Sequence, residues 1–385
     1  MTPMNFDLPP EIVDLQRTVR DFAAKEIAPN AARWSEDEHF PSPVFGRLAD
    51  LGLMGMLVPE EYGGTDAGMV AYVAVMEELG AADQSVAAAW NAHSTIASLP
   101  LAAFGAPEQK ERWLRPLASG ERLGAFGLTE PSAGSDAAGI TTRAERRDGG
   151  WVINGTKMFI SNAGTDISLG VTVLAVTGTG GNGRKRYATF FVPEGTAGYT
   201  KGNRLKKLGW HALDTRELVF TDCFVPDDHL VGEEGNGLRQ FLSVLEKGRI
   251  SVAALGLSLT AAALRLGVRH ARTRHQFGRP LSDFQAVAHK LADIATEYEA
   301  ARGLVYKAAW LADQGRPHST EAAMAKLYAS EVANRAASQS VQVHGGYGYI
   351  RESDISRFYA DAKILEIGEG TSEVQRNVIA RALTR

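Results

Sequence analysis

The chain has 385 residues, of which 44% are hydrophobic and 22% charged, a balance typical of a soluble globular protein with two or three domains. Its formal net charge of −4 lacks the basic excess that nucleic-acid binding requires, so we expect no nucleic-acid partner. Cys223 is the only cysteine, which excludes a disulfide framework and a thiolate metal cluster. A reducing, cytoplasmic location fits this cysteine usage.

Two segments bear on targeting and membranes. The first ten residues, MTPMNFDLPP, lack the basic segment and the apolar run of a signal peptide. The longest mostly apolar stretch, Val252–Leu264, is too short to span a bilayer. We therefore predict a buried core helix there and no association with a membrane.

The first third of the chain has apolar residues at helical spacing. From Glu11 to Ile27 they recur every three or four residues, and the pattern ends before Pro29. Residues 1–120 are predicted to form a helical N-terminal domain. Its further helices are expected at Pro43–Leu51, Met69–Leu79, Ser85–Phe104 and Pro107–Ala118.

The character of the sequence changes near Gly120 to segments rich in Val, Ile, Thr and Phe. Asp148-Gly149-Gly150 and Asn154-Gly155 are typical of β-hairpin turns. No long helical pattern intervenes, so we predict an antiparallel β middle domain over residues 121–232 and not a parallel sheet. Its strands are expected at Trp151–Ser161, Gly170–Thr177, Tyr187–Pro193 and Thr215–Pro226.

Gly178, Gly180 and Gly183 match the G-x-G-x-x-G pattern of dinucleotide-binding loops. Such a loop must open a helix, whereas here the chain leads directly into a predicted strand. We therefore interpret these glycines as a flexible hairpin loop.

Long helical patterns return after Gly237, and residues 233–385 are predicted to form a helical C-terminal bundle. The fold class is therefore α+β, with a helical, a β and a helical domain in that order. The C-terminal helices are expected at Leu238–Arg274, Asp283–Asp313, Ser319–His344, Glu352–Ile367 and Ser372–Leu383.

The loop between the last two predicted helices holds Glu369 with a glycine on each side. Gly368 is placed to end the first helix in a left-handed conformation, and Ser372 and Gln375 match a capping box that begins the second. A solvated loop carboxylate is the ordinary interpretation. The functional alternative rests on the close approach that glycines permit and on the attraction of helix N-termini for anions.

Two segments of the β domain have residues suited to a heteroaromatic ligand. Phe126–Asp136 offers an aromatic ring, hydroxyls and glycines that could bind a ring and a phosphate, although an ordinary Gly/Ser turn would fit equally well. Phe159 and Ser161 lie on the same side of a strand, where they offer a stacking face and a hydroxyl. A core phenylalanine is the alternative for Phe159.

Two segments of the C-terminal domain combine charged and small residues. Arg272–Phe277 places cations at a helix end beside an aromatic residue, either as a solvated terminus or as an anion site. His344 precedes Gly345 and Gly346 and could be a base, yet a histidine at a helix end is more often structural. The sequence has no spacing of metal ligands, so we predict no metal.

These motifs, taken in order over essentially the whole chain, resemble the acyl-CoA dehydrogenase family. The motifs are L-T-E-P-S-A-G-S-D, N-G-T-K-M-F-I-S-N-A-G, K-L-G-W followed by D-T-R-E-L-V-F, R-x-x-F-G, Q-V-H-G-G and E-G-T-S-E-V-Q-R. The resemblance implies the same helical, β and helical domains, usually assembled as a homotetramer.

The resemblance also implies an FAD site and an acyl-CoA site. The residues that would hold the flavin ring are Phe126, Leu128, Thr129, Ser135, Phe159, Ile160 and Ser161. Those that would bind the phosphate and adenosine across a subunit interface are Arg274, Phe277, Gln285, Gln342, Gly345 and Gly346. Cofactor contacts from the C-terminal loop would come from Thr371, Ser372 and Glu373. Residues near the acyl-CoA substrate would be Ser135, Leu245, Glu246, Arg249 and Gly370.

By the same resemblance Glu369 is the catalytic base that removes the Cα proton of the thioester while hydride leaves Cβ for the flavin. Some relatives carry the base just before the arginine that matches Arg249, and that position is Gly248 here. Gly368 stands where short- and medium-chain members often carry Tyr, which predicts room for a short chain that is branched or ring-bearing. His211 replaces a common Arg, and Phe159 a larger Trp.

The favoured function is therefore an FAD-dependent acyl-CoA dehydrogenase that passes electrons to an electron-transfer flavoprotein. An acyl-CoA oxidase or a flavin monooxygenase of the same fold is the alternative, and a non-enzymatic helical scaffold is a third possibility. A monooxygenase has no use for an α-proton base, so the retained Glu369 argues against it. A scaffold could have lost Glu369 and the flavin-contacting hydroxyls, yet both remain.

Overall fold

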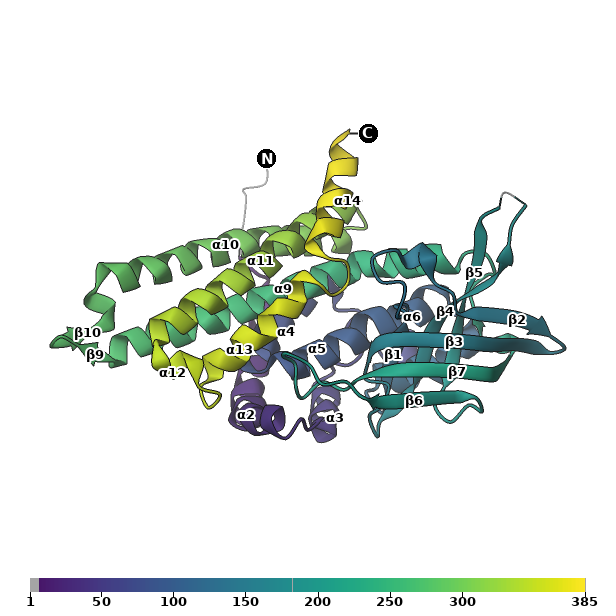
Figure 1. Cartoon of the computed structure of the whole chain (residues 1–385), viewed down its shortest axis with the longest axis horizontal. Helices are drawn as coiled ribbons and strands as arrows, with labels where there is room; N and C mark the ends of the chain where they lie inside the picture. Colours follow the sequence, from purple (N-terminus) through teal and green to yellow (C-terminus); the bar gives the residue numbers. More distant parts are fainter. Residues whose placement is uncertain (1–6, 182, 385) are drawn as a thin grey trace.

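A computed structural model of the chain describes residues 7–181 and 183–384, so most of the segment considered for a signal peptide lies outside the described residues. The chain forms a helical part, a β-sheet part and a second helical part in that order (Figure 1). The predicted α+β class is confirmed. The sheet lies at one end of an elongated molecule, and the long C-terminal helices extend away from it.

The N-terminal part is helical as predicted, but the first helix does not end before Pro29. A single turn of π-helix, Ala23–Ile27, joins α1 to α2 and carries the helical path past the proline. Pro29 then lies in the first turn of α2, directly after the π-turn in which the Ala28 N–H donates to the Ala23 carbonyl. The helices are α1 (Pro10–Phe22), α2 (Ala28–Glu36), α3 (Ser42–Asp50), α4 (Gly68–Ala82), α5 (Gln84–Ala92), α6 (Ser98–Phe104), α7 (Pro107–Gln109) and α8 (Arg115–Ala118).

The helix expected at Ser85–Phe104 is likewise divided, because a π-turn at His93–Ala97 separates α5 from α6. Asp83 caps α5 by accepting a hydrogen bond from the Val86 N–H at 2.8 Å. Turns of π-helix are frequent at functional sites. This one begins two residues after Asn91, which contacts the loop carboxylate described below.

The middle part is a largely antiparallel sheet in which the strands lie in the order β6-β7-β3-β2-β4-β5-β8, with β1 paired in parallel to β4. Strands β1, β2, β6 and β8 were not predicted from the sequence, since they are short and, in β2 and β6, largely polar and partly exposed. The strands are β1 (Leu123–Gly127), β2 (Arg143–Arg147), β3 (Gly150–Ser161), β4 (Ser168–Thr179), β5 (Lys185–Pro193), β6 (Tyr199–Arg204), β7 (Thr215–Pro226) and β8 (Leu230–Val231).

One predicted hairpin turn is correct and another is wrong. Gly149, with φ of 75°, lies in the turn between β2 and β3. Asn154-Gly155 instead lies inside β3 at a bulge opposite β7, where Asn154 and Asp222 exchange two hydrogen bonds. The chain around Gly180 joins β4 to β5 as an antiparallel hairpin, as predicted, with residue 182 outside the described part.

The C-terminal part is a bundle of long helices with a small β-hairpin at its far end (Figure 1). Gly256 of α9 lets the backbone of α11 approach, because a Cβ there would meet the Ala329 carbonyl oxygen at 2.8 Å. The elements are α9 (Gly237–Thr273), β9 (His275–Gln276), β10 (Arg279–Pro280), α10 (Gln285–Asp313), α11 (Ser319–His344), α12 (Gly346–Tyr349), α13 (Asp354–Ala362) and α14 (Ser372–Thr384).

Helix α9 is long and apolar enough to cross a membrane, but 83% of its most apolar window is buried inside the protein. It therefore serves as the central core helix, packed against α4, α10 and α11. Buried side chains of the N-terminal and C-terminal helices form one continuous core, whereas the sheet has its own. This shared core brings α4 and α5 against the loop that holds Glu369.

Candidate active site

The loop before α14 reverses direction at Glu369 and Gly370, with φ of 52° and 95°. The prediction that Gly368 adopts the left-handed conformation is therefore wrong. The Gly368 N–H still donates to the Ile364 carbonyl at 2.8 Å, so the preceding helical turn continues through it and the reversal comes one residue later. A non-glycine residue held at positive φ costs of order 1–3 kcal/mol, and such residues are concentrated at functional sites.

The N-terminus of α14 also differs from the predicted capping box. The Thr371 hydroxyl accepts the hydrogen bond from the Val374 N–H at 3.3 Å, and Ser372 is already inside the helix. Gln375 turns its amide nitrogen toward the loop and donates to the Gly370 carbonyl at 2.9 Å. The cap lies one residue earlier than predicted because the left-handed pair before it ends at Gly370.

The Glu369 carboxylate is enclosed by side chains from three helices. Asn91 of α5 donates from Nδ2 to Oε1 at 3.3 Å, and among the described residues Oε2 is buried without a hydrogen-bond partner. Burial raises the pKa of Glu369 from 4.5 to about 7, although the charges of Lys326 and Arg249 and the Asn91 hydrogen bond oppose this rise. A carboxylate with a pKa near neutrality is suited to accept a proton from carbon.

Lys326 of α11 supports the same loop. Its side chain is buried, and Nζ donates to the Gly370 carbonyl at 2.7 Å. Desolvation lowers the pKa of Lys326 to about 8, whereas the negative charge of Glu369 favours its protonated form. The ammonium group thus fixes the backbone beside the base and partly offsets the charge of the base.

Helix α9 supplies the wall next to the free oxygen of Glu369. A Cβ at Gly248 would lie 2.1 Å from Oε2, so only glycine leaves room for the carboxylate in this position. Arg249 has a buried Nε that lacks a partner among the described residues, and desolvation lowers its pKa while the charge of Glu246 opposes that shift. Arg249 and Gly370 therefore lie near the base, Glu246 lies beside Arg249, and Leu245 packs in a separate apolar cluster with Ile96. The contact of these four residues with a substrate stays a prediction.

Of the residues assigned to the flavin ring, Phe126 and Leu128 pack against α9. Phe126 stacks on Phe241 at 4.2 Å between ring centroids, in an apolar cluster that includes Leu128, Ile96 and Leu245. This cluster connects the β1 segment to the helix that carries Arg249. Ser135 is exposed on the loop that follows.

A buried ion pair holds the loop that contains Thr129. Lys157 Nζ lies 2.9 Å from Glu130 Oε1 and donates to the Leu128 carbonyl at 3.0 Å. Burial would raise the pKa of Glu130, but the charge of Lys157 and hydrogen bonds from Thr141 and Thr142 lower it to about 2. The Thr129 carbonyl in turn accepts from the Met158 N–H at 2.8 Å, which ties this loop to β3.

Phe159 and Ser161 end β3 in an irregular conformation. Phe159 has φ of 63° at a bulge and a 65% exposed side chain, so it is not a core residue. Ile160 is buried behind it, and Ser161 is half-buried. An exposed aromatic ring beside a hydroxyl and the Thr129 segment fits a planar heteroaromatic cofactor, because stacking would cover a ring that water solvates poorly.

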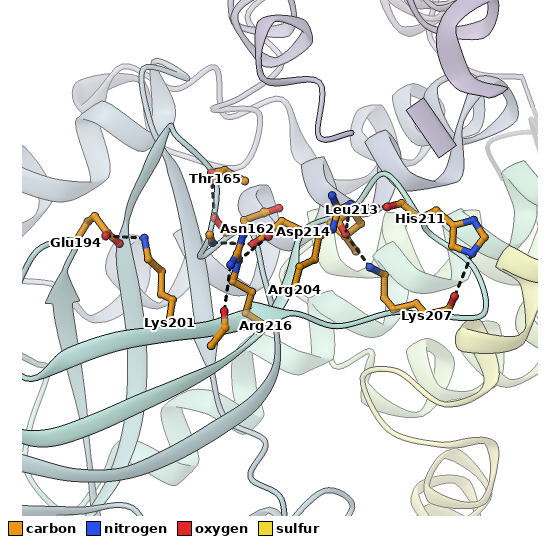
Figure 2. A network of polar contacts seen from close by, with 12 residues as sticks. Asn162, Thr165, Glu194, Lys201, Arg204, Lys207, His211, Leu213, Asp214 and Arg216 are labelled. Carbon is orange, nitrogen blue, oxygen red and sulfur yellow. Dashed lines mark hydrogen bonds and ion pairs between the residues drawn. The ribbon is translucent and has the colours of Figure 1, made fainter. Parts of the chain in front are cut away.

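The strand end is held by a polar network that spans the β6–β7 loop (Figure 2). The Asn162 N–H donates to the Asp214 carbonyl at 3.2 Å, and the Asn162 side-chain amide donates to the Ala89 carbonyl of α5 at 2.9 Å. Arg216 pairs with the Asp214 carboxylate at 2.8 Å. His211 bridges Ser35 and the Lys207 carbonyl, which identifies it as a support of this loop.

The residues assigned to the phosphate and adenosine part lie elsewhere in the chain. Arg274 lies over the ring of Tyr347 at 5.5 Å, and Phe277 is 92% exposed. Elements β9, β10 and α12 place this group at the end of the bundle remote from the sheet (Figure 1). One protomer therefore does not unite the two groups. The exposed members of this second group are Arg274, Phe277, Gln285, Gln342, Gly345 and Gly346.

The structure also shows the surroundings of the residues predicted at the start of α14 and of His344. Ser372 is buried and Glu373 is exposed at the first turn of α14, and the Thr371 hydroxyl helps to lower the pKa of Glu373. His344 Nδ1 lies 2.7 Å from the Ser340 carbonyl oxygen, and the ring stacks on His270, away from Glu369. Among residues 7–181 and 183–384, no group of three or more His, Cys, Asp or Glu is arranged to hold a metal ion.

Two contributors to the site were not found from the sequence: Asn91 and Lys326. Lys326 had a detectable signal, because it occupies a position in the buried alanine stripe of α11 together with Ala322 and Ala329. A charged residue at such a position requires a partner. Asn91 has no comparable signal, since its partner is 278 residues away in the chain.

The fold and the site together define a class: an enzyme with a helical, a β and a helical part, a buried loop carboxylate enclosed by helices, and an exposed aromatic ring at the end of β3 suited to a planar cofactor. Family models agree with this arrangement over nearly the whole chain. The model of the acyl-CoA dehydrogenase N-terminal domain matches residues 9–121, that of the middle domain 125–223 and that of the C-terminal domain 235–384.

The sequence is 46% identical over 382 residues to a probable acyl-CoA dehydrogenase, YngJ, of Bacillus subtilis, covering 99% of this chain and 100% of that protein. It is 41% identical over 387 residues to the short-chain specific acyl-CoA dehydrogenase of Megasphaera elsdenii, covering 99% and 100%. The structure of butyryl-CoA dehydrogenase from Megasphaera elsdenii is similar with a TM-score of 0.95 and 40% identity, covering 99% and 100%. The chain belongs to the acyl-CoA dehydrogenase family, as the resemblance predicted, and is an oxidoreductase.

Two further solved structures bear on cofactor and partner. PigA with FAD and proline is similar with a TM-score of 0.93 and 28% identity, covering 99% of each chain. A chain in a structure described as the electron transferring flavoprotein of Acidaminococcus fermentans has a TM-score of 0.95 and 38% identity, covering 99% and 100%. Membership of this family implies a flavin cofactor.

Proposed function

We propose that the protein catalyses α,β-dehydrogenation of a short or branched acyl-CoA thioester to the trans-2-enoyl-CoA. The observation that carries this proposal is the buried carboxylate of Glu369, which has one oxygen held by Asn91 and the other free of hydrogen bonds to the described residues. Its pKa, raised to about 7, gives it the basicity to remove a weakly acidic Cα proton. The short-chain and butyryl-CoA descriptions of the relatives support the substrate class.

The chain's own residues have distinct tasks in this reaction. Glu369 accepts the α-proton at Oε2, and Lys326 and Arg249 favour the ionised form from which it acts. The Glu369 backbone N–H is the expected donor to the thioester oxygen as enolate charge develops. The apolar walls formed by Ile96, Phe241 and Leu245 exclude water from the acyl chain.

We propose FAD as the cofactor, bound noncovalently at about one per chain. The Thr129 loop and Phe159 would hold its ring, and the cofactor would supply the acceptor for the hydride from Cβ. The remote position of Arg274 and Gln342 in the protomer supports binding of its phosphate and adenosine part to a neighbouring subunit, and hence an oligomer, which the family resemblance predicts to be a homotetramer. A preparation treated with FAD that never takes up flavin would contradict this proposal.

We propose an electron-transfer flavoprotein as the electron acceptor and the cytoplasm as the location. The similarity to a chain in an electron transferring flavoprotein structure supports the partner. The location rests on the single, buried Cys223, which fits a reducing compartment.

The test is an anaerobic titration of the flavin-loaded protein with straight, branched and aromatic acyl-CoAs while flavin absorbance is followed. Bleaching without oxygen by butyryl- or isobutyryl-CoA is the expected result. Wild-type enzyme that no acyl-CoA of the panel bleaches would refute dehydrogenation as the function.

A further inference from the structure

Asn91 is a buried residue whose amide contacts the proposed base on one side and a tyrosine on the other. Its Nδ2 donates to Glu369 Oε1 at 3.3 Å, and its Oδ1 accepts from the Tyr72 hydroxyl at 2.9 Å. Asn91 is 4% exposed and Tyr72 is fully buried. The contacts join α5 and α4 to a loop that lies 278 residues beyond Asn91 in the chain.

Tyr72 is itself held by rigid neighbours. Its ring stacks on Trp90 at 4.4 Å between centroids, with an angle of 11° between the planes. The Trp90 indole N–H donates to the Leu53 carbonyl at 2.9 Å, which fixes the ring on which Tyr72 stacks. The tyrosine hydroxyl therefore has a defined position and little freedom to follow a moving partner.

The position of the Tyr72 hydroxyl decides which side of the Asn91 amide faces the base. An amide has an acceptor on one side and a donor on the other, and the hydroxyl proton binds the acceptor side. The donor side is then directed at Glu369. The reverse orientation would place the Asn91 oxygen against the carboxylate oxygen. Both atoms are hydrogen-bond acceptors when the base is ionised, so they would repel each other.

We propose that Asn91, oriented by Tyr72, is a positioning residue that holds Glu369 Oε1 and leaves Oε2 as the oxygen that accepts the substrate proton. The proposal rests on the function proposed for Glu369. The two carboxylate oxygens differ in their surroundings, since Oε1 is anchored by the amide and Oε2 is buried beside Gly248 without a partner among the described residues. A base held through one oxygen keeps the other in a fixed direction for proton transfer.

The charges around the carboxylate determine what loss of the anchor would do. Lys326 on α11 and Arg249 on α9 face it and favour its ionised form, Glu246 lies beside Arg249, and Tyr72 on α4 is neutral because burial and the charge of Glu369 raise the pKa of its hydroxyl. Both cations remain when Asn91 is replaced. The hydrogen bond from the amide also favours the ionised form, so its removal must raise the pKa of Glu369.

The test compares Asn91→Leu and Tyr72→Phe with wild type as flavin-loaded enzymes. The first measurement is single-turnover flavin reduction by butyryl-CoA over a range of pH. The second, without substrate, is the carboxylic-acid C=O band in infrared difference spectra between pH values, assigned by its loss in Glu369→Gln. We expect Asn91→Leu to move both midpoints upward by about one pH unit, and flavin reduction near pH 7 to slow by about fivefold.

Tyr72→Phe keeps the stacked ring and the Asn91 amide but removes the orienting hydroxyl, so a smaller upward shift of both midpoints is expected. Gln84→Leu is the matched control, because Gln84 is a buried amide on the same helix that donates to Ser258 at 2.9 Å and not to Glu369. It should leave both midpoints unchanged.

Equal midpoints in wild type, Asn91→Leu and Tyr72→Phe would overturn the proposal, even if the rates fall at every pH, because such a loss would reflect packing alone. If Asn91→Leu does not fold, Tyr72→Phe still decides the question. Wild-type flavin that no acyl-CoA of the panel bleaches would contradict the proposed function instead, and the infrared titration would still measure the effect of Asn91 on Glu369.

Discussion

Replacing Gly248 with alanine tests whether the space beside Glu369 is essential for its action. The added Cβ would lie 2.1 Å from Oε2 and 3.2 Å from Cδ, whereas ordinary contacts begin at about 3.4 Å. The carboxylate must therefore move by about 1.3 Å or rotate away from α9. Displacements of this size at a reacting group cost on the order of 10²-fold in rate.

The folded state should tolerate this change well. The clashing atoms belong to the end of a flexible side chain, and the third neighbour, Ile96 Cγ2, lies at 3.4 Å. Alanine in place of glycine inside a helix gains up to about 1 kcal/mol, which offsets part of the strain. We therefore expect a midpoint of thermal unfolding close to wild type together with a large loss of activity.

Stopped-flow flavin reduction with saturating acyl-CoA measures the rate directly, and Gly303→Ala is the control. Gly303 lies on the exposed side of α10, where an added methyl group would have no other described atom within 4 Å, so its replacement should neither slow the reaction nor lower stability. Reduction by Gly248→Ala at the wild-type rate, with normal folding, would refute the argument that Glu369 acts from this position.

Four other changes have defined outcomes. Glu369→Gln should bind acyl-CoA yet reduce flavin on the order of 10²–10⁴-fold more slowly. The folded-state pKa of Glu369 is raised from 4.5 to about 7, so ionisation of this carboxylate lowers the free energy of unfolding of wild type as the pH rises through this range. In denaturant unfolding, Glu369→Gln should therefore be more stable than wild type by up to about 3 kcal/mol at alkaline pH but not at acid pH. Lys157→Met should cost about 3–5 kcal/mol in the same assay, because it leaves the buried Glu130 carboxylate unpaired; a loss below about 1 kcal/mol would contradict the role of this pair. Arg274→Ala should lose FAD on dilution before it loses helical circular dichroism, and an unchanged FAD affinity would count against a shared site. Gly368→Tyr should lower kcat/KM for branched relative to straight acyl-CoAs, since only the Ile364 carbonyl, at 3.5 Å, lies near a Cβ there; an unchanged ratio would show that protein fills this space.

Several features follow from the sequence because they depend on neighbours in the chain. The spacing of apolar residues is enough to predict the long helices α9, α10 and α11. Runs of β-branched residues bounded by turn residues predict the central strands of the sheet. The loop around Glu369 was identified by its glycines and by the order of motifs across the chain. Short polar strands such as β2 were missed, because pairing with β3 and not local preference stabilises them.

Predictions made from the local preferences of glycine were wrong at two places where long-range contacts select the backbone conformation. Glu369 and not Gly368 takes the left-handed position, and the loop carbonyl after it is held by Lys326 from another helix. Asn154-Gly155 was assigned to a turn but forms a bulge, because pairing with β7 continues on both sides of it. In both cases, contacts with distant segments outweigh the local preference for glycine in such conformations.

The local sequence thus determined the order of the domains and the long helices, and the resemblance carried by motifs along the whole chain supplied the candidate base. Only the tertiary structure decided that Asn91 donates to Glu369, that Gly248 leaves room for its second oxygen, and that burial raises its pKa to about 7 against the opposing charges of Lys326 and Arg249. Hydrogen bonds and desolvation depend on distances between side chains that are far apart in the chain. Those distances exist only once α4, α5, α9 and α11 have packed into one core.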